Sequence, residues 1–111
     1  MFGLFNGTKK YENIGSAEMQ KIMGEDKNAI VLDVRTKDEF KSGHIPGAKN
    51  IDIFSPTFST EIDMLDKTKT YLVYCRSGNR SGSACGAMAS KGFDKLYNLS
   101  GGIGAWQGPV K

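Results

Sequence analysis

The sequence predicts an α/β fold in which a doubly wound parallel sheet carries helices on both faces. Apolar runs of strand character alternate with helical patterns along the 111 residues. The run Ala29–Val34 is almost continuously apolar, which is typical of a strand buried on both faces. No repeat or linker divides the chain. We therefore expect one domain over residues 11–111, preceded by an arm of residues 1–10 that is rich in glycine and ends in two lysines.

The expected strands are short runs rich in apolar and aromatic residues. In chain order they are 11–14, 29–34, 48–51, 71–74 and 95–98. The first has the weakest pattern. The turn Ile45-Pro46-Gly47 precedes the third, and Pro56 makes the stretch 54–60 loop-like. Each strand pattern is followed by a helical pattern, as parallel connections require.

The expected helices follow these strands. In chain order they are 16–23, 37–42, 61–65, 81–91 and 101–106. Ser16 is the candidate cap of the first helix, which Gly24 would end. Thr36 and Glu39 form a capping-box pattern before the second. Ser81 is the candidate cap of the fourth.

Composition argues against several classes of protein. The net charge of +3 is modest and the basic residues are scattered, so a nucleic-acid partner is not expected. Two cysteines are too few for a secreted disulfide scaffold, and one histidine argues against a zinc site. No metal or other cofactor is expected. No apolar run is long enough to span a bilayer, and the first residues do not resemble a signal peptide, so we expect a cytoplasmic protein without a membrane partner.

A candidate nucleophile lies where the 71–74 strand meets the following loop. Cys75 occupies the carboxyl end of this strand, which is where ligands of open α/β sheets bind. A loop that turns into a helix directs several backbone N–H groups at one point, and the helix dipole adds positive charge there. We therefore expect a lowered pKa for Cys75, which would make its thiolate an activated nucleophile.

The residues after Cys75 are expected to form an anion-binding cradle. They are Arg76, Ser77, Gly78, Asn79 and Arg80. Ser77 and Asn79 would contribute mainly main-chain groups, and Gly78 a positive φ or a close approach. Arg76 and Arg80 could attract an anionic substrate and lower the thiol pKa, or they could form salt bridges with surface acids.

Other polar residues have more than one interpretation. Cys85 shares a helical face with small apolar residues and is expected in the core, although it could be a resolving thiol for oxidised Cys75. Arg35 could pair with Glu39 four residues later, and we expect a structural role for Asp33 at its strand end.

Three groups of residues occur in an informative order. The first comprises Leu32-Asp33-Val34-Arg35, Glu39-Phe40, Gly43-His44-Ile45-Pro46-Gly47-Ala48 and Asn50-Ile51; the second is Cys75-Arg76-Ser77-Gly78-Asn79-Arg80-Ser81; the third is Leu99-Ser100-Gly101-Gly102-Ile103 with Ala105-Trp106. Together they resemble the rhodanese family of sulfurtransferases in its single-domain form. The resemblance covers residues from about 11 to 108.

This resemblance implies transfer of a sulfane sulfur through a persulfide on Cys75. The donor would be thiosulfate, a polysulfide or another persulfide, and loop 76–80 would cradle the bound sulfur. The implied acceptor is cyanide in assays and a thiol in the cell. The implied partners are thus a small anionic sulfur donor and a nucleophilic acceptor, with a sulfur-relay protein as an alternative donor.

Two other functions compete with this one. Cysteine-dependent phosphatases resemble Cys-x5-Arg, whereas Cys75 and Arg80 form a Cys-x4-Arg spacing, and Tyr74 rather than a histidine precedes the cysteine. A non-catalytic rhodanese-like binding module would share the fold. Such modules often lack the cysteine that this chain has.

Overall fold

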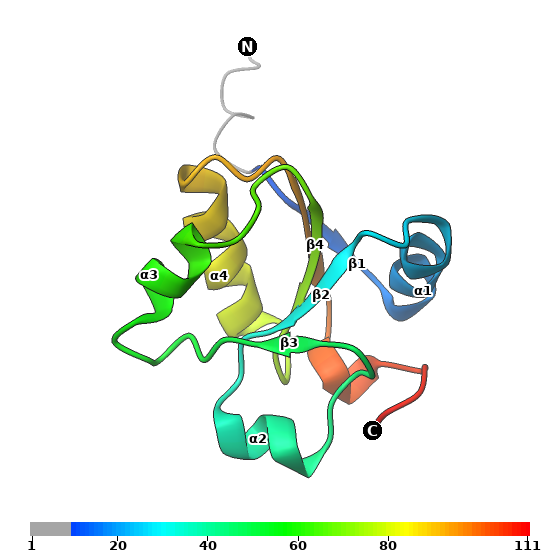
Figure 1. Ribbon diagram of the computed structural model, residues 1–111. Coiled ribbons are helices and arrows are strands. Elements are labelled where there is room, and N and C mark those ends of the chain that lie inside the picture. The colour runs from blue at the N-terminus through cyan, green and yellow to red at the C-terminus, as the bar shows by residue number, and fades with distance from the viewer. Residues whose placement is uncertain (1–9) are drawn as a thin grey trace.

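Five parallel strands form one sheet in the computed structural model, which describes residues 10–111 (Figure 1). Residues 1–9, most of the arm expected at 1–10, lie outside the described residues. The strands are β1 (Glu12–Ile14), β2 (Ile30–Asp33), β3 (Lys49–Asn50), β4 (Thr70–Tyr74) and β5 (Lys95–Leu99). Their order is β1-β5-β4-β2-β3, and every pairing is parallel. The predicted parallel sheet is therefore confirmed, with β4 at its centre.

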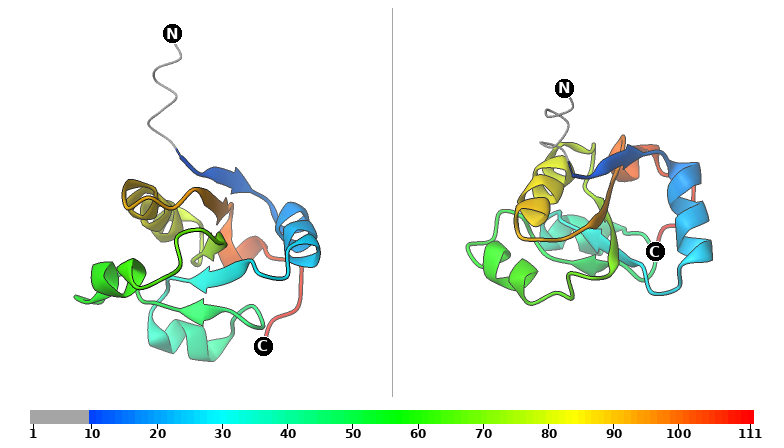
Figure 2. Two further views of the ribbon diagram at one scale, coloured as in Figure 1. Left: turned by 45° about the horizontal axis from the view of Figure 1, so that its top comes forward. Right: turned by 90° about the horizontal axis from the view of Figure 1, so that it is seen from above.

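Helices cover both faces of this sheet, as predicted. They are α1 (Ser16–Glu25), α2 (Lys37–Ser42), α3 (Phe58–Asp63), α4 (Asn79–Ser90) and the 3₁₀ helix η2 (Gly102–Ala105). Helices α3 and α4 lie on one face and α1 on the other (Figures 1 and 2). Helix α2 and η2 lie at the end of the sheet where the strands have their carboxyl ends, beside the loop that follows β4. No helix within residues 10–111 has the length and apolar character needed to cross a bilayer.

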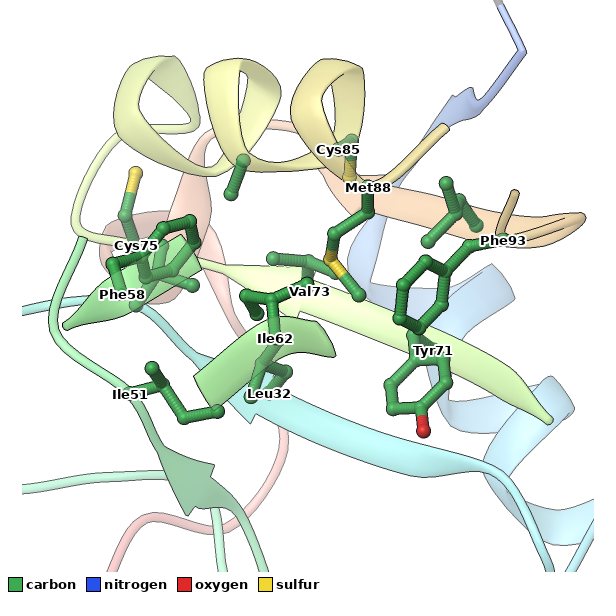
Figure 3. Packing of buried hydrophobic residues seen from close by; sticks show 13 residues of the cluster. Leu32, Ile51, Phe58, Ile62, Tyr71, Val73, Cys75, Cys85, Met88 and Phe93 are labelled. Carbon is green, nitrogen blue, oxygen red and sulfur yellow. The ribbon is translucent and has the colours of Figure 1, made fainter. Parts of the chain in front are cut away.

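The alternation of side chains along β4 divides the core into two clusters. Tyr71 and Val73 pack with residues of α3 and α4, whereas Leu72 and Tyr74 pack on the α1 face. Cys75 follows in the same alternation and belongs to the α4 cluster. Figure 3 shows its side chain beneath the beginning of α4. The period of the strand thus places the thiol under the helix start.

Both ends of helix α1 differ from the sequence prediction. Ser16 is not a cap: Gly15 occupies the N-cap position without a side-chain bond, and Ser16 Oγ instead accepts the N–H of Gln107 at 2.9 Å. Helix α1 also continues through Gly24 to Glu25. The backbone of Gly24 keeps a negative φ, so this glycine does not act as a left-handed terminator.

The capping-box prediction for α2 is confirmed. Thr36 Oγ1 accepts the N–H of Glu39 at 3.2 Å, and Glu39 Oε1 accepts the N–H of Thr36 at 3.0 Å. Helix α3, in contrast, begins at Phe58 rather than at 61. Phe58 and Ile62 lie one helical turn apart, and both are buried in the cluster that contains α4 residues. Burial of these two side chains stabilises the additional turn at the start of α3.

Candidate active site

Several hydrogen-bond donors converge on the Cys75 sulfur. The N–H of Gly78 donates to Sγ at 3.1 Å, and the Ser81 hydroxyl donates at 3.3 Å. Backbone hydrogen bonds from Ser77 and Ser81 also lower the pKa of the Cys75 thiol. The loop therefore wraps around Sγ and presents N–H and O–H groups to it. This arrangement suits a negatively charged sulfur.

Ser81 was expected only as a helix cap, and that prediction is wrong. Gly78, with a left-handed φ of 104°, is the N-cap, so α4 begins two residues earlier than predicted and Ser81 lies in its first turn. A signal for this was present in the sequence. Ser81 lies three, four and seven residues before Ala84, Cys85 and Met88, and all four are buried on one helical face.

These hydrogen bonds decide the pKa of Cys75. Burial has the largest single influence and acts to raise the pKa. The hydrogen bonds from the Ser81 hydroxyl and from the amides of Ser81, Gly78 and Ser77 together outweigh burial and leave the pKa below its usual value. The main causes of the lowered pKa are thus hydrogen bonds from the loop and from the first turn of α4.

Replacing Ser81 with alanine is expected to raise the pKa of Cys75. The hydroxyl makes a charge-assisted bond to the thiolate, and its loss corresponds to about one pKa unit. The pH dependence of Cys75 alkylation by iodoacetamide measures this. Ser83→Ala is the matched control, because Ser83 is exposed on the same helix. Equal midpoints for the Ser81 variant and the wild type would contradict the assignment.

Cys75 lies directly beneath an exposed loop. The residue itself is 1% exposed. Arg76, Ser77 and Asn79, however, are all exposed, and Gly78 is half-buried. The Cys75 side chain is therefore covered by a loop whose own residues are largely in contact with solvent.

Arg80 forms an ion pair with Glu39 of α2, the alternative that the sequence left open. Its Nη1 and Nη2 donate to the two carboxylate oxygens at 2.8 and 3.0 Å. The Arg80 guanidinium also lies 5.8 Å from the ring centroid of Phe54, a phenylalanine that is 69% exposed. The charge of Arg80 is thus balanced by Glu39, and its side chain is partly buried. Arg76, in contrast, is exposed.

The predicted pair between Arg35 and Glu39 is wrong. Arg35 instead binds Asp33, with Nη2 at 2.7 Å from Oδ2, and also donates to the Gly43 carbonyl oxygen at 2.6 Å. Glu39 is already engaged by its capping box and by Arg80. Asp33 is fully buried and can accept two N–H groups of one guanidinium, so it is the better partner.

Replacing Glu39 with glutamine is expected to lower stability in a pH-dependent way. The hydrogen bond from Arg80 is the largest cause that lowers the pKa of Glu39, which falls to about 2. Burial acts to raise this pKa, and the hydrogen bonds from Thr36 lower it further. A folded pKa below the unfolded value stabilises the protein above about pH 4.5, and this contribution disappears as the pH falls to about 2. The variant should lose about 1 kcal/mol at pH 7.

Urea unfolding at pH 7 and at pH 2 measures this difference. Glu61→Gln is the control, because Glu61 lies in the first turn of α3 and accepts a bond from the Thr57 hydroxyl, far from Arg80 in the sequence. A loss of stability for Glu39→Gln that is the same at both pH values would argue against the ion pair as its source.

The segment around η2 supports the loop from below. The N–H of Ile103 donates to the Cys75 carbonyl oxygen at 2.9 Å, and the N–H of Gly104 donates to that of Arg76 at 3.2 Å. Gly102, at a φ of 60°, packs against the same two carbonyl groups. The third sequence group thus lies against the second and fixes its backbone.

Cys85 lies away from these donors. It is fully buried, as predicted for a core residue, and its Sγ is 3.9 Å from the Tyr97 carbonyl oxygen. Burial, assisted by the charge of Cys75, raises the pKa of Cys85 to about 12. Within residues 10–111, no three His, Cys, Asp or Glu side chains are grouped so that they could hold a metal ion.

Comparison with known proteins gives consistent matches. The family model described as Rhodanese-like domain matches residues 16–109. The YtwF protein of Bacillus subtilis is 34% identical over 100 residues, which cover 90% of this chain and 94% of that one. The thiosulfate sulfurtransferase GlpE of Ectopseudomonas mendocina is 31% identical over 99 residues, which cover 88% and 86%. The crystal structure of a rhodanese-related protein from Thermoplasma volcanium superposes with a TM-score of 0.79 at 31% identity, covering 91% and 98%.

Proposed function

Because the chain belongs to the rhodanese-like domain family, we propose that it is a sulfurtransferase that carries a sulfane sulfur on Cys75. The observation that carries this proposal is the convergence of the Gly78 N–H and the Ser81 hydroxyl on the Cys75 sulfur. An activated thiolate at the start of a helix is what a nucleophilic cysteine requires.

The reaction divides into two half-reactions. The Cys75 thiolate attacks the outer sulfur of thiosulfate, the bond between the two donor sulfurs breaks, and sulfite leaves with the electron pair. An acceptor thiolate or cyanide then attacks the outer sulfur of the Cys75 persulfide, and the Cys75 thiolate is released. Each step exchanges one nucleophile for another at sulfur, so no external oxidant or reductant is needed. Ping-pong kinetics are expected.

The loop stabilises both charged states of this cycle. The outer sulfur of a persulfide carries the negative charge, and each N–H directed at it makes a charge-assisted hydrogen bond. Gly78, Ser77 and Ser81 supply these donors, while the exposed side chain of Arg76 attracts an anionic donor. Arg80 and Asn79 contribute mainly by beginning α4 and fixing the loop.

Thiosulfate is the proposed donor because GlpE, a relative of similar length, is named as a thiosulfate sulfurtransferase. A polysulfide, or a persulfide delivered by a sulfur-relay protein, would enter the same chemistry. The proposed acceptor is cyanide in assays and a thiol in the cell. The cytoplasmic location stays a prediction.

A non-catalytic rhodanese-like binding module is the second candidate. The observation that favours it is the 1% exposure of Cys75, since a sulfur held beneath the loop need not react. The two functions differ in whether Cys75 can form a persulfide, and a mass measurement distinguishes them.

Intact mass after incubation with thiosulfate tests the proposed function. A gain of about 32 Da, one sulfur atom, is expected, and dithiothreitol should remove it. The Cys75→Ser variant should show no gain. An unchanged mass for the wild-type protein, with thiosulfate and with an inorganic polysulfide, would support the binding module instead.

Replacing Cys85 with serine is expected to leave most sulfur transfer intact. Its side chain is buried against the Tyr97 carbonyl and its high pKa keeps the thiol protonated. Turnover of thiosulfate with cyanide measures the effect, with the folded fraction checked by circular dichroism. A near-complete loss of activity in folded protein would assign Cys85 to the reaction as a resolving thiol.

A further inference from the structure

Asn98 connects the interior of the sheet with the loop around Cys75. It lies near the carboxyl end of β5, paired in register with Val73 of β4 and Asn13 of β1, and is 4% exposed. Its Nδ2 donates to the Gly78 carbonyl oxygen at 3.2 Å and to Asn13 Oδ1 at 2.9 Å. One amide nitrogen of β5 thus connects β1 with the N-cap residue of α4.

These two bonds set the orientation of the Asn98 amide. Within residues 10–111, its Oδ1 is buried and has no hydrogen-bond partner. A buried polar atom without a partner costs about 1–3 kcal/mol. The contacts of Nδ2 with Gly78 and Asn13 outweigh that cost. The Asn98 side chain is therefore oriented so that its Nδ2 binds the loop, while its Oδ1 is left without a hydrogen bond from the described residues.

Gly78 is the residue whose conformation directs the cradle. Its N–H donates to Cys75 Sγ, and its carbonyl oxygen accepts from Asn98 and from the N–H of Gly82. A Cβ on Gly78 would lie 3.4 Å from the Leu99 carbonyl oxygen, so the turn after β5 fills the adjacent space. The two peptide groups meet at one Cα with a φ of 104°, and holding one restricts the direction of the other.

We propose that Asn98 is a positioning residue of the active site: by holding the Gly78 carbonyl, it keeps the Gly78 N–H directed at the Cys75 sulfur. This inference rests on the proposed role of Cys75 as the nucleophile. It adds a residue of β5 to a site in which the hydrogen bonds to the Cys75 sulfur come from the loop and the first turn of α4. Asn98 acts through Gly78 and does not itself touch the sulfur.

The test compares Asn98→Leu with Asn13→Ala. Leucine keeps the branch of the asparagine side chain at Cγ but donates no hydrogen bond. Asn13→Ala removes the partner of Asn98 on β1 and leaves the bond of Asn98 to Gly78. The rate of Cys75 alkylation by iodoacetamide is measured against pH, with the modified peptide identified by mass. The midpoint of the profile reports the thiol pKa, and the plateau reports access to the sulfur. The charged groups on neighbouring elements, the Arg80–Glu39 and Asp33–Arg35 pairs and Arg76, are the same in every variant.

Asn98→Leu is expected to raise the midpoint by about 0.7 unit, the equivalent of one weakened hydrogen bond, while Asn13→Ala leaves it unchanged. If Asn98→Leu does not fold, the same profile of Asn98→Ser, whose side chain is shorter, decides the question. An unchanged midpoint in a folded Asn98 variant, or an equal rise in Asn13→Ala, would overturn the proposal. Alkylation uses no sulfur donor, so a protein that fails to form a persulfide still gives a readable midpoint.

Discussion

Cys75→Ser is expected to abolish the transfer of sulfur from thiosulfate to cyanide, by at least about a thousandfold. The serine hydroxyl stays protonated at neutral pH and cannot hold a sulfane sulfur as a persulfide. Its oxygen can still accept hydrogen bonds from the Gly78 N–H and the Ser81 hydroxyl, which now contact the sulfur. The variant should therefore fold, and the loss should be chemical.

Initial rates of thiocyanate formation measure this effect, and a thermal melt confirms the folded state. Cys85→Ser is the matched control, because it changes the second cysteine of the chain in the same way. Activity remaining at a tenth of the wild-type rate in the Cys75 variant would refute the nucleophile assignment. It would also remove the basis for the loop as a sulfur cradle.

Gly102→Ala is expected to have the largest effect on stability. A Cβ at this position would lie 2.4 Å from the carbonyl carbon and oxygen of Arg76 and 2.5 Å from the Cys75 carbonyl oxygen. The φ of 60° is also unfavourable for alanine. Because the clash is with backbone, no side chain can rotate away to relieve it. We expect a loss of more than about 3 kcal/mol, or a fall in Tm of about 12–24 °C.

Thermal unfolding followed by circular dichroism measures the loss. Gly86→Ala is the control, since Gly86 is an exposed residue inside α4 where a Cβ would meet no atom within 4 Å. That variant should gain about 0.5–1 kcal/mol from helix propensity. A Gly102→Ala protein as stable as the wild type would mean that η2 does not pack against the active loop as described.

The surviving folded fraction of Gly102→Ala is also informative. The carbonyl groups of Cys75 and Arg76 accept hydrogen bonds from the N–H groups of Ile103 and Gly104. A displaced η2 would break both bonds and free the backbone at the start of the loop. Sulfur transfer per folded molecule should therefore also be lower than in the wild type, because the loop around Cys75 would lose this support. A fall in activity per folded molecule would show that the segment around η2 is needed for the geometry of the loop after Cys75.

Local patterns predicted the parts of this fold that depend on near neighbours. The continuous apolar run before Asp33 gave a buried parallel strand, and the capping box at Thr36 and Glu39 was confirmed. The strand–loop–helix pattern around Cys75 predicted a thiol near a helix start, and the alternation of β4 places it there. These features are set within a few residues of the chain, where the periods of strands and helices act directly.

Contacts between distant residues could not be predicted in this way. Arg80 pairs with Glu39, forty-one positions earlier, and Asn98 reaches Gly78 because β5 lies beside β4. Arg35 pairs with Asp33 and not with Glu39, because the carboxylate of Glu39 is already engaged by Thr36 at the start of α2 and by Arg80 of α4. Spacing along the chain carries no information about such competition.

The sequence by itself determined the class of fold, the two-sided sheet and the position of Cys75 at the carboxyl end of a strand; the structure shows that this strand is the central one. Only the tertiary structure decided which donors reach the sulfur, since this depends on where Gly78 turns the chain and on what holds Gly78 in place. The physical reason is that hydrogen bonds select partners within about 3 Å. The order of the strands sets those distances, and local sequence does not.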